Sequence, residues 1–153
     1  MLAQYHPNFS KYKTQIENCI THFTSSGKDF VIGKRNAIKL FELENEVISI
    51  KSFKKPNIIN KIVYRYFRKS KARRSFEFAS KLMEMQIGTP QPVAFFENYD
   101  FIGLKESYYA CQHLENVFEF REIVQNEAFE IEILSSESLP NLPLKCTKKA
   151  LSF

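Results

Sequence analysis

A lysine and a glutamate have the residue types and positions in this sequence that best suit chemistry. Lys51 ends the apolar run ISIK, in a segment that alternates like a β-strand. A lysine fixed on a rigid strand can hold nucleotide phosphates as a point charge. Glu77 is the only acidic residue between Lys51 and Lys81, so its carboxylate is well placed to pair with Lys51. The simpler interpretations are an exposed strand lysine and an i,i+4 surface pair of Glu77 with Arg73 or Lys81.

The positive charge of the chain is concentrated in one segment. The net charge is +5, but residues 51–81 carry eleven basic groups and one acidic group, a local net charge of +10. Such a segment creates a strong positive potential, so we expect anionic partners: nucleotide phosphate, phosphorylated lipid headgroups or nucleic acid. The alternative is a solvated helical face that has no partner.

Length and composition indicate a globular protein of one domain, or part of one. Its 153 residues are 44% hydrophobic and 14% aromatic, which is enough to build a core. No stretch approaches the roughly 20 apolar residues of a membrane helix, and the N-terminus lacks the plan of a signal peptide. The three cysteines lie far apart, which argues against a disulfide framework or a zinc site and favours a reducing compartment. These features predict a cytoplasmic protein.

The hydrophobic pattern predicts an α+β fold. In order, the expected elements are a three-stranded meander at 28–55, helices at 57–68 and 70–85, strands at 92–97 and 104–114, and acidic helical residues at 116–137. This order corresponds to a five-stranded antiparallel sheet with an inserted helix, followed by one or two C-terminal helices. It is the plan of the small lobe, or N-lobe, of a protein-kinase-like fold.

Both central helices carry apolar residues at helical spacing, which should face the sheet. In the first helix Lys61, Arg65 and Arg68 should lie outside, opposite an apolar side. The residues of that side are Ile58, Ile59, Ile62, Val63, Tyr66 and Phe67. The second helix should begin at a Ser70 cap and pack through a stripe of residues. The stripe is Ala72, Phe76, Ala79 and Met83.

The centre of the sequence resembles a known enzyme family. The motif FKKPN follows the strand lysine, SKARRSFE begins the second helix, TPQP follows that helix, and GLKESYYACQHL comes next. Together, over about residues 28–134, they resemble the bacterial lipopolysaccharide kinases, the Kdo/heptose kinases of Gram-negative bacteria, which have a protein-kinase-like fold. The resemblance implies phosphorylation of an inner-core lipopolysaccharide sugar, with ATP and magnesium as cofactors.

The resemblance also implies a set of nucleotide-binding residues. They are Lys51, Glu77, Gly33, Asn36, Gln112, His113 and Leu114. The first two match the strand lysine that holds phosphate and the helix glutamate that pairs with it. The next two match the loop between the first two strands, where a single glycine replaces the usual Gly-rich cradle, so we expect weakened nucleotide binding. The last three match the hinge whose backbone meets adenine.

The carboxylates that phosphoryl transfer needs are not where the resemblance implies. One aspartate positions the acceptor hydroxyl and another holds magnesium, and in the family both follow the hinge. The two aspartates of this sequence, Asp29 and Asp100, precede it. We therefore expect no catalytic or metal-binding residue and no activity. The expected domains are an N-terminal extension (1–27), the small lobe (28–114) and the start of a truncated large lobe (115–153).

A second hypothesis is a non-catalytic module whose basic segment binds anionic lipid or RNA, and a third is a fragment without function. An inward Lys51–Glu77 pair favours kinase ancestry, and an outward Lys51 favours the module. The expected partners are the lipopolysaccharide core or an anionic membrane surface, with nucleic acid less favoured. Either partner is compatible with a cytoplasmic protein that is peripheral at the inner membrane.

Overall fold

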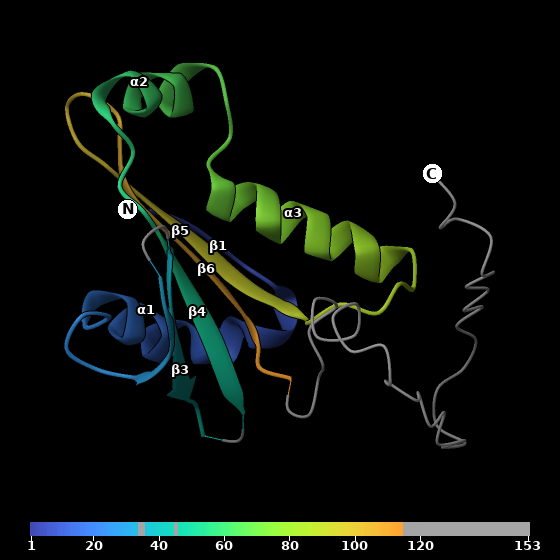
Figure 1. Ribbon diagram of the computed structural model, residues 1–153. Helices are drawn as coiled ribbons and strands as arrows, with labels where there is room; N and C mark the ends of the chain where they lie inside the picture. The colour runs from blue at the N-terminus through green and yellow to red at the C-terminus, as the bar shows by residue number, and fades with distance from the viewer. Residues whose placement is uncertain (34–35, 45, 115–153) are drawn as a thin grey trace, which may run out of the picture. The chain divides into compact units, whose positions relative to one another are not determined.

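The computed structural model describes residues 1–33, 36–44 and 46–114, which form one antiparallel sheet with helices on both faces (Figure 1). The strands follow the spatial order β1-β5-β6-β4-β3-β2. They are β1 (Leu2–Tyr5), β2 (Lys28–Ile32), β3 (Asn36–Glu42), β4 (Val47–Phe53), β5 (Pro92–Tyr99) and β6 (Leu104–Gln112). The helices are the 3-10 helix η1 (Pro7–Tyr12), α1 (Lys13–Thr21), α2 (Ile58–Tyr66) and α3 (Lys71–Glu84). The predicted segments 116–137 and 115–153 lie outside the described residues.

The α+β class and the antiparallel meander β2-β3-β4 are confirmed, with six strands in place of the expected five. The additional strand is β1, which pairs with β5 at the edge of the sheet. Its four residues are too few to show a period of two, so the sequence pattern could not identify it. Strand β5 runs to Tyr99, two residues beyond its predicted end, and β6 ends at Gln112, two residues before its predicted end.

One face of the sheet packs on the N-terminal residues. Phe9 and Ile16, from η1 and α1, join Ile48, Ile50 and other side chains in one buried cluster. Ile48 and Ile50 are both fully buried, which confirms the predicted alternation of β4. The segment expected as an extension therefore contributes to the main core of the described fold.

The opposite face is partly covered by α3. Ser70 caps this helix by accepting the N–H of Arg73 at 3.1 Å, as the sequence predicts. Ala72 and Ala79 are buried together with Phe76, whose ring meets that of Phe95 at a centroid distance of 5.5 Å. Met83, also expected in this stripe, is only partly buried.

Helix α2 corrects the prediction, because its apolar side does not face the sheet. No residue of α2 is buried, and Ile58 and Tyr66 are 66% and 68% exposed. The predicted outer residues Lys61 and Arg65 instead bind the turn between β5 and β6. Helical spacing identifies two sides of a helix but not which one turns inward, and here polar bonds decide it. No helix among the described residues is long and apolar enough to cross a bilayer.

Candidate functional site

Lys51 lies near the middle of the sheet, on the face that α3 partly covers. Strand β4 places it opposite Ile38 of β3 and Tyr109 of β6. Its neighbour Ile50 is buried on the other face, whereas Lys51 is half-buried. The Lys51 Nζ lies 5.4 Å from the centre of the Phe53 ring, a cation–π contact. The backbone that carries this ammonium group is thus fixed by ladders on both sides.

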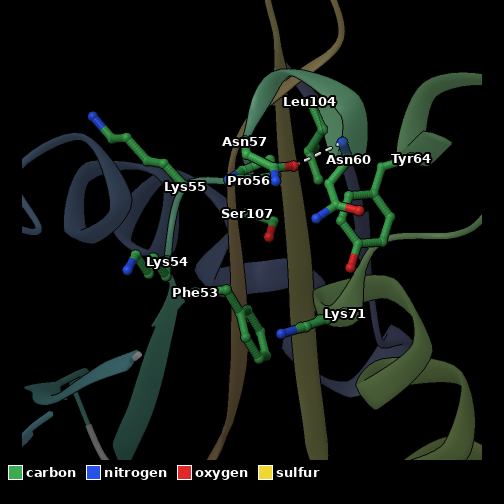
Figure 2. A pocket seen from close by; sticks show the side chains of 10 residues that line it. All are labelled: Phe53, Lys54, Lys55, Pro56, Asn57, Asn60, Tyr64, Lys71, Leu104 and Ser107. Carbon is green, nitrogen blue, oxygen red and sulfur yellow. Dashed lines mark hydrogen bonds between the residues drawn. The ribbon is translucent and has the colours of Figure 1, made fainter. Parts of the chain in front are cut away.

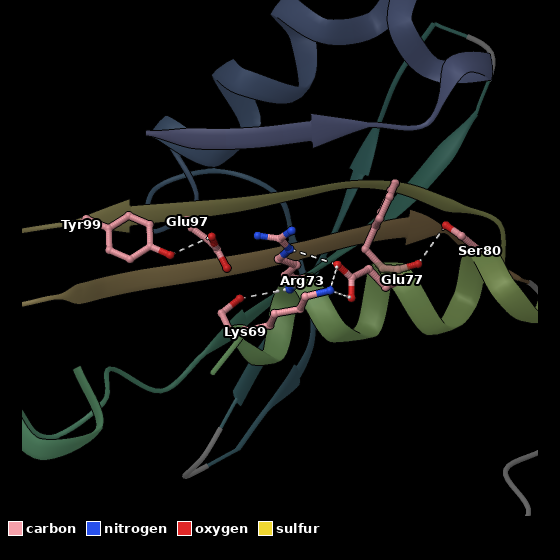
Figure 3. Close-up of polar contacts among 8 residues, drawn as sticks. Lys69, Arg73, Glu77, Ser80, Glu97 and Tyr99 are labelled. Atoms are coloured by element: carbon pink, nitrogen blue, oxygen red, sulfur yellow. Dashed lines mark hydrogen bonds and ion pairs between the residues drawn. The ribbon is translucent and has the colours of Figure 1, made fainter. Parts of the chain in front are cut away.

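Glu77 has other partners than the predicted one. Its carboxylate oxygens each accept a hydrogen bond from Lys69 Nζ at 2.8 Å, and one accepts from Arg73 Nε at 3.0 Å (Figure 3). The bond from Lys69, aided by that from Arg73, holds the pKa of Glu77 below its ordinary value. Among the described residues no ion pair joins Lys51 to Glu77. The predicted pair is therefore not formed in this structure, because the linker lysine and the i,i+4 arginine occupy the carboxylate.

Gly33 and Asn36 close the hairpin between β2 and β3. The N–H of Gly33 donates to the Asn36 carbonyl at 2.9 Å, and Asn36 pairs with Phe53 in the ladder. The hairpin therefore lies beside the end of β4 that is nearer to Lys51, where the phosphate end of the predicted site would be. A side chain at Gly33 would meet the Asn36 carbonyl at 3.4 Å, so packing alone does not demand glycine there.

The predicted hinge lies near the other end of β4. The N–H groups of Gln112 and His113 each donate to a main-chain carbonyl at 2.9 Å, so both donors are engaged inside the protein. The His113 ring packs edge-on against Phe30, with centroids 5.4 Å apart. An adenine bound at this end would have to accept a hydrogen bond from the main-chain N–H of Leu114, a residue that is 40% exposed.

A pocket of about 460 Å³ lies between the end of β4, helix α2 and the start of α3 (Figure 2). The side chains of Lys71 and Tyr64 approach it from the two helices, and Ser107 lines it from β6. Lys54 and Lys55 border it, but Figure 2 shows their ammonium groups directed away from the other lining side chains. The FKKPN motif therefore borders a polar pocket that the sequence did not predict, and Lys51 is not among its lining residues.

A buried carboxylate on β5 was also missed by sequence reasoning. Glu97 is 1% exposed and accepts the Tyr99 hydroxyl at 2.9 Å (Figure 3). Burial, followed by that bond to Glu97, raises the pKa of Tyr99 to about 12. The second oxygen of Glu97 has no hydrogen-bond partner among the described residues. An acidic residue directly after the apolar run VAFF of a buried strand was the available signal.

The family resemblance implies magnesium as a cofactor, but the described residues form no site for it. No group of three His, Cys, Asp or Glu residues lies close enough to hold a metal ion in that part of the chain. The two aspartates are engaged by lysines, Asp29 by Lys39 at 3.3 Å and Asp100 by Lys61. The arrangement can offer cations to a phosphate, but its carboxylates do not form a metal site.

Comparisons with known proteins support the fold. No family model matches the sequence, and no curated protein matches it. A solved structure of WaaP in complex with acyl carrier protein is similar, with a TM-score of 0.54 and 13% sequence identity. The alignment covers 82% of this chain and 46% of that one, so this chain spans less than half the length of its neighbour. WaaP is a lipopolysaccharide core heptose kinase. The kinase-like fold predicted from the sequence is thereby confirmed, and the narrower family resemblance stays a prediction.

Proposed function

We propose that this chain is the small lobe of a lipopolysaccharide-kinase-like protein and that Lys51 holds nucleotide phosphate. The observation that carries the proposal is the position of Lys51, half-buried on β4 in a sheet whose fold is similar to that of WaaP. An ammonium group that is partly withdrawn from water interacts more strongly with phosphate than an exposed one. The β2–β3 hairpin at Gly33 and Asn36 lies at the same end of the sheet and supplies the loop beside the phosphates.

Glu77 is assigned the role of orienting Lys51 when nucleotide is bound. Its present partners, Lys69 and Arg73, have side chains that are 53% and 38% exposed. Ion pairs this exposed typically contribute about 0.2–1 kcal/mol each. Turning the carboxylate towards Lys51 would therefore cost little compared with the charge-assisted bonds that phosphate forms.

Binding without transfer is the expected behaviour of the 153-residue chain. Phosphoryl transfer depends on carboxylates that orient the acceptor hydroxyl and retain magnesium. Asp29 and Asp100, the two aspartates of the sequence, are each paired with a lysine. Neither lies in a group that could hold a metal ion within the described residues.

The proposal is tested by titrating ATP into the wild-type chain, Lys51→Ala and Lys105→Ala and measuring each affinity by calorimetry. Lys105 is an exposed lysine of β6 and controls for the loss of one positive charge. A hydrogen bond to a charged group contributes about 1.5–3 kcal/mol, so Lys51→Ala should weaken ATP binding tenfold or more. The Lys105 variant should bind as the wild type does.

A second assay uses radiolabelled ATP, magnesium and a lipid A–Kdo acceptor. We expect no measurable transfer by any of the three proteins. Equal ATP affinity of the wild type and Lys51→Ala would show that Lys51 does not bind the nucleotide. Transfer that disappears in Lys51→Ala would instead show that carboxylates outside the described residues complete an active centre.

A further inference from the structure

Helix α2 presents its apolar side to solvent, unlike an ordinary surface helix. Amphipathic helices of globular proteins place their apolar stripe against the core. Here four apolar side chains of α2 and that of the residue that follows it are exposed, by 42% to 82%, while Val63 and Tyr64 are partly buried. The exposed side chains are those of Ile58, Ile59, Ile62, Tyr66 and Phe67.

The polar side of α2 is fixed to the protein, so this orientation is not a loose arrangement. Lys61 pairs with Asp100, and Arg65 Nη1 donates to the carbonyls of Asp100 and Phe101 at 3.0 and 2.9 Å. The backbone of Lys61 also lies so close to Gly103 that a Cβ there would overlap it. Three independent contacts therefore hold the helix with its apolar side outward.

The turn between β5 and β6, which Lys61 and Arg65 of α2 bind, carries a further exposed aromatic side chain. Phe101 is fully exposed at this turn, next to the arginine that binds its carbonyl. Figure 1 shows α2 and this turn together at one end of the sheet. We call the combined surface the α2 face. It consists of Ile58, Ile59, Ile62, Tyr66, Phe67 and Phe101.

The charge around the α2 face is positive. Residues 54–74 contain nine basic residues and no acidic one. Four of the nine are engaged in ion pairs, with Glu77, Asp100 and Glu106. Lys54, Arg68 and Lys71 are exposed and have no ion pair within the described part of the chain. Of these three cations, Arg68 directly follows Phe67 of the α2 face, whereas Lys54 and Lys71 line the pocket with Asn60 and Tyr64. An apolar surface bordered by an exposed cation within this basic segment complements a surface that has an apolar interior and an anionic exterior.

We propose that the α2 face inserts into the headgroup layer of an anionic lipid bilayer. Aliphatic and aromatic side chains enter the acyl boundary, while neighbouring lysine and arginine side chains bind lipid phosphates. The protruding Phe101 distinguishes a bilayer from a folded partner, because a protein would need a matching cavity and lipid deforms around the ring. This surface is separate from Lys51, so the inference does not depend on nucleotide binding.

The test is co-sedimentation of the whole 153-residue protein with vesicles of equal parts phosphatidylglycerol and phosphatidylcholine, or of phosphatidylcholine alone. The double variant Ile59→Ser/Phe101→Ser removes two members of the α2 face. The control Phe78→Ser removes a side chain of α3 that is 60% exposed. We expect anionic vesicles to bind the wild type and the control equally, and the double variant at least about tenfold more weakly.

A second measurement does not depend on the stability of the double variant. The sequence has no tryptophan, so Phe101→Trp and Phe78→Trp each carry one emitting residue. Emission at position 101 should shift to the blue with anionic vesicles and be quenched by brominated lipid, while emission at 78 should not. No shift at 101, equal binding to neutral vesicles, or a wild-type dimer that the double variant dissociates would each overturn the proposal.

Discussion

Replacing Phe76 by alanine should destabilise the fold by about 3 kcal/mol, whereas the same substitution at Phe78 should be nearly neutral. Both residues lie within α3, so the chemical change and the helix propensities are identical. The difference between them is burial, since Phe76 is 4% exposed and Phe78 is 60% exposed. The pair therefore isolates the contribution of packing between α3 and the sheet.

The magnitude follows from the size of the cluster that Phe76 fills. Truncation of a buried phenylalanine to alanine costs about 3–5 kcal/mol. Within the described part of the chain, the buried partners of Phe76 are only Ala72 and Phe95, with Phe53 and Tyr109 partly buried beside them. Such a small cluster can relax into part of the space, which favours the lower end of the range. The edge-to-face contact with Phe95 accounts for about 0.5–1.5 kcal/mol of the loss.

Urea denaturation followed by far-ultraviolet circular dichroism measures both free energies of unfolding. Phe78→Ala should stay within about 0.5 kcal/mol of the wild type. Equal losses for the two variants would show that α3 does not pack through Phe76. The position of Glu77, which lies between them on the same helix, would then have to be reconsidered.

Two further predictions concern the attachment of α2. Gly103→Ala should loosen α2 and lower the free energy of unfolding by about 1–3 kcal/mol, because the new methyl group would overlap the Lys61 backbone. Gly88→Ala is the matched control, since a methyl group there would meet no atom of the described residues within 4 Å. Hydrogen exchange of the α2 amides should rise in the first variant only. The bond from Lys61, followed by main-chain N–H groups of the turn, lowers the pKa of Asp100 from 3.8 to about 2. The stabilisation from Asp100 is therefore present above pH 3.8 and lost as the pH falls towards 2; Asp100→Asn should remove that part of the pH dependence of stability.

Much of the sheet could be predicted because strand residues that alternate between two faces leave a clear pattern. Ile48 and Ile50 are buried on one face and Lys51 lies on the other, as the period of two requires. The Ser70 cap also predicted the start of α3 correctly. Its end was also predicted to within one residue, since the helix stops at Glu84 and the expected end was residue 85.

The features that were missed depend on contacts between distant residues. The inversion of α2 depends on Asp100, which lies 39 residues after Lys61 in the sequence. The pairing of Glu77 with Lys69 depends on the path of the linker between α2 and α3. Neither residue spacing nor local charge contains this information. The sequence therefore predicted the strand that carries Lys51 and the helix that carries Glu77, but not the partners that Glu77 binds.

The unformed Lys51–Glu77 pair is weaker evidence than the position of Lys51. The two ion pairs that occupy Glu77 are partly exposed, and such pairs are screened by water and salt. A carboxylate held by two such pairs can change partners at a cost of about 0.4–2 kcal/mol. Moving Lys51 to the other face would instead require a one-residue shift of β4, which would expose Ile48 and Ile50 and remove their burial from the core. The sheet thus fixes the lysine far more firmly than the helix fixes the partner of its glutamate, and the kinase-like interpretation depends on the feature that is harder to change.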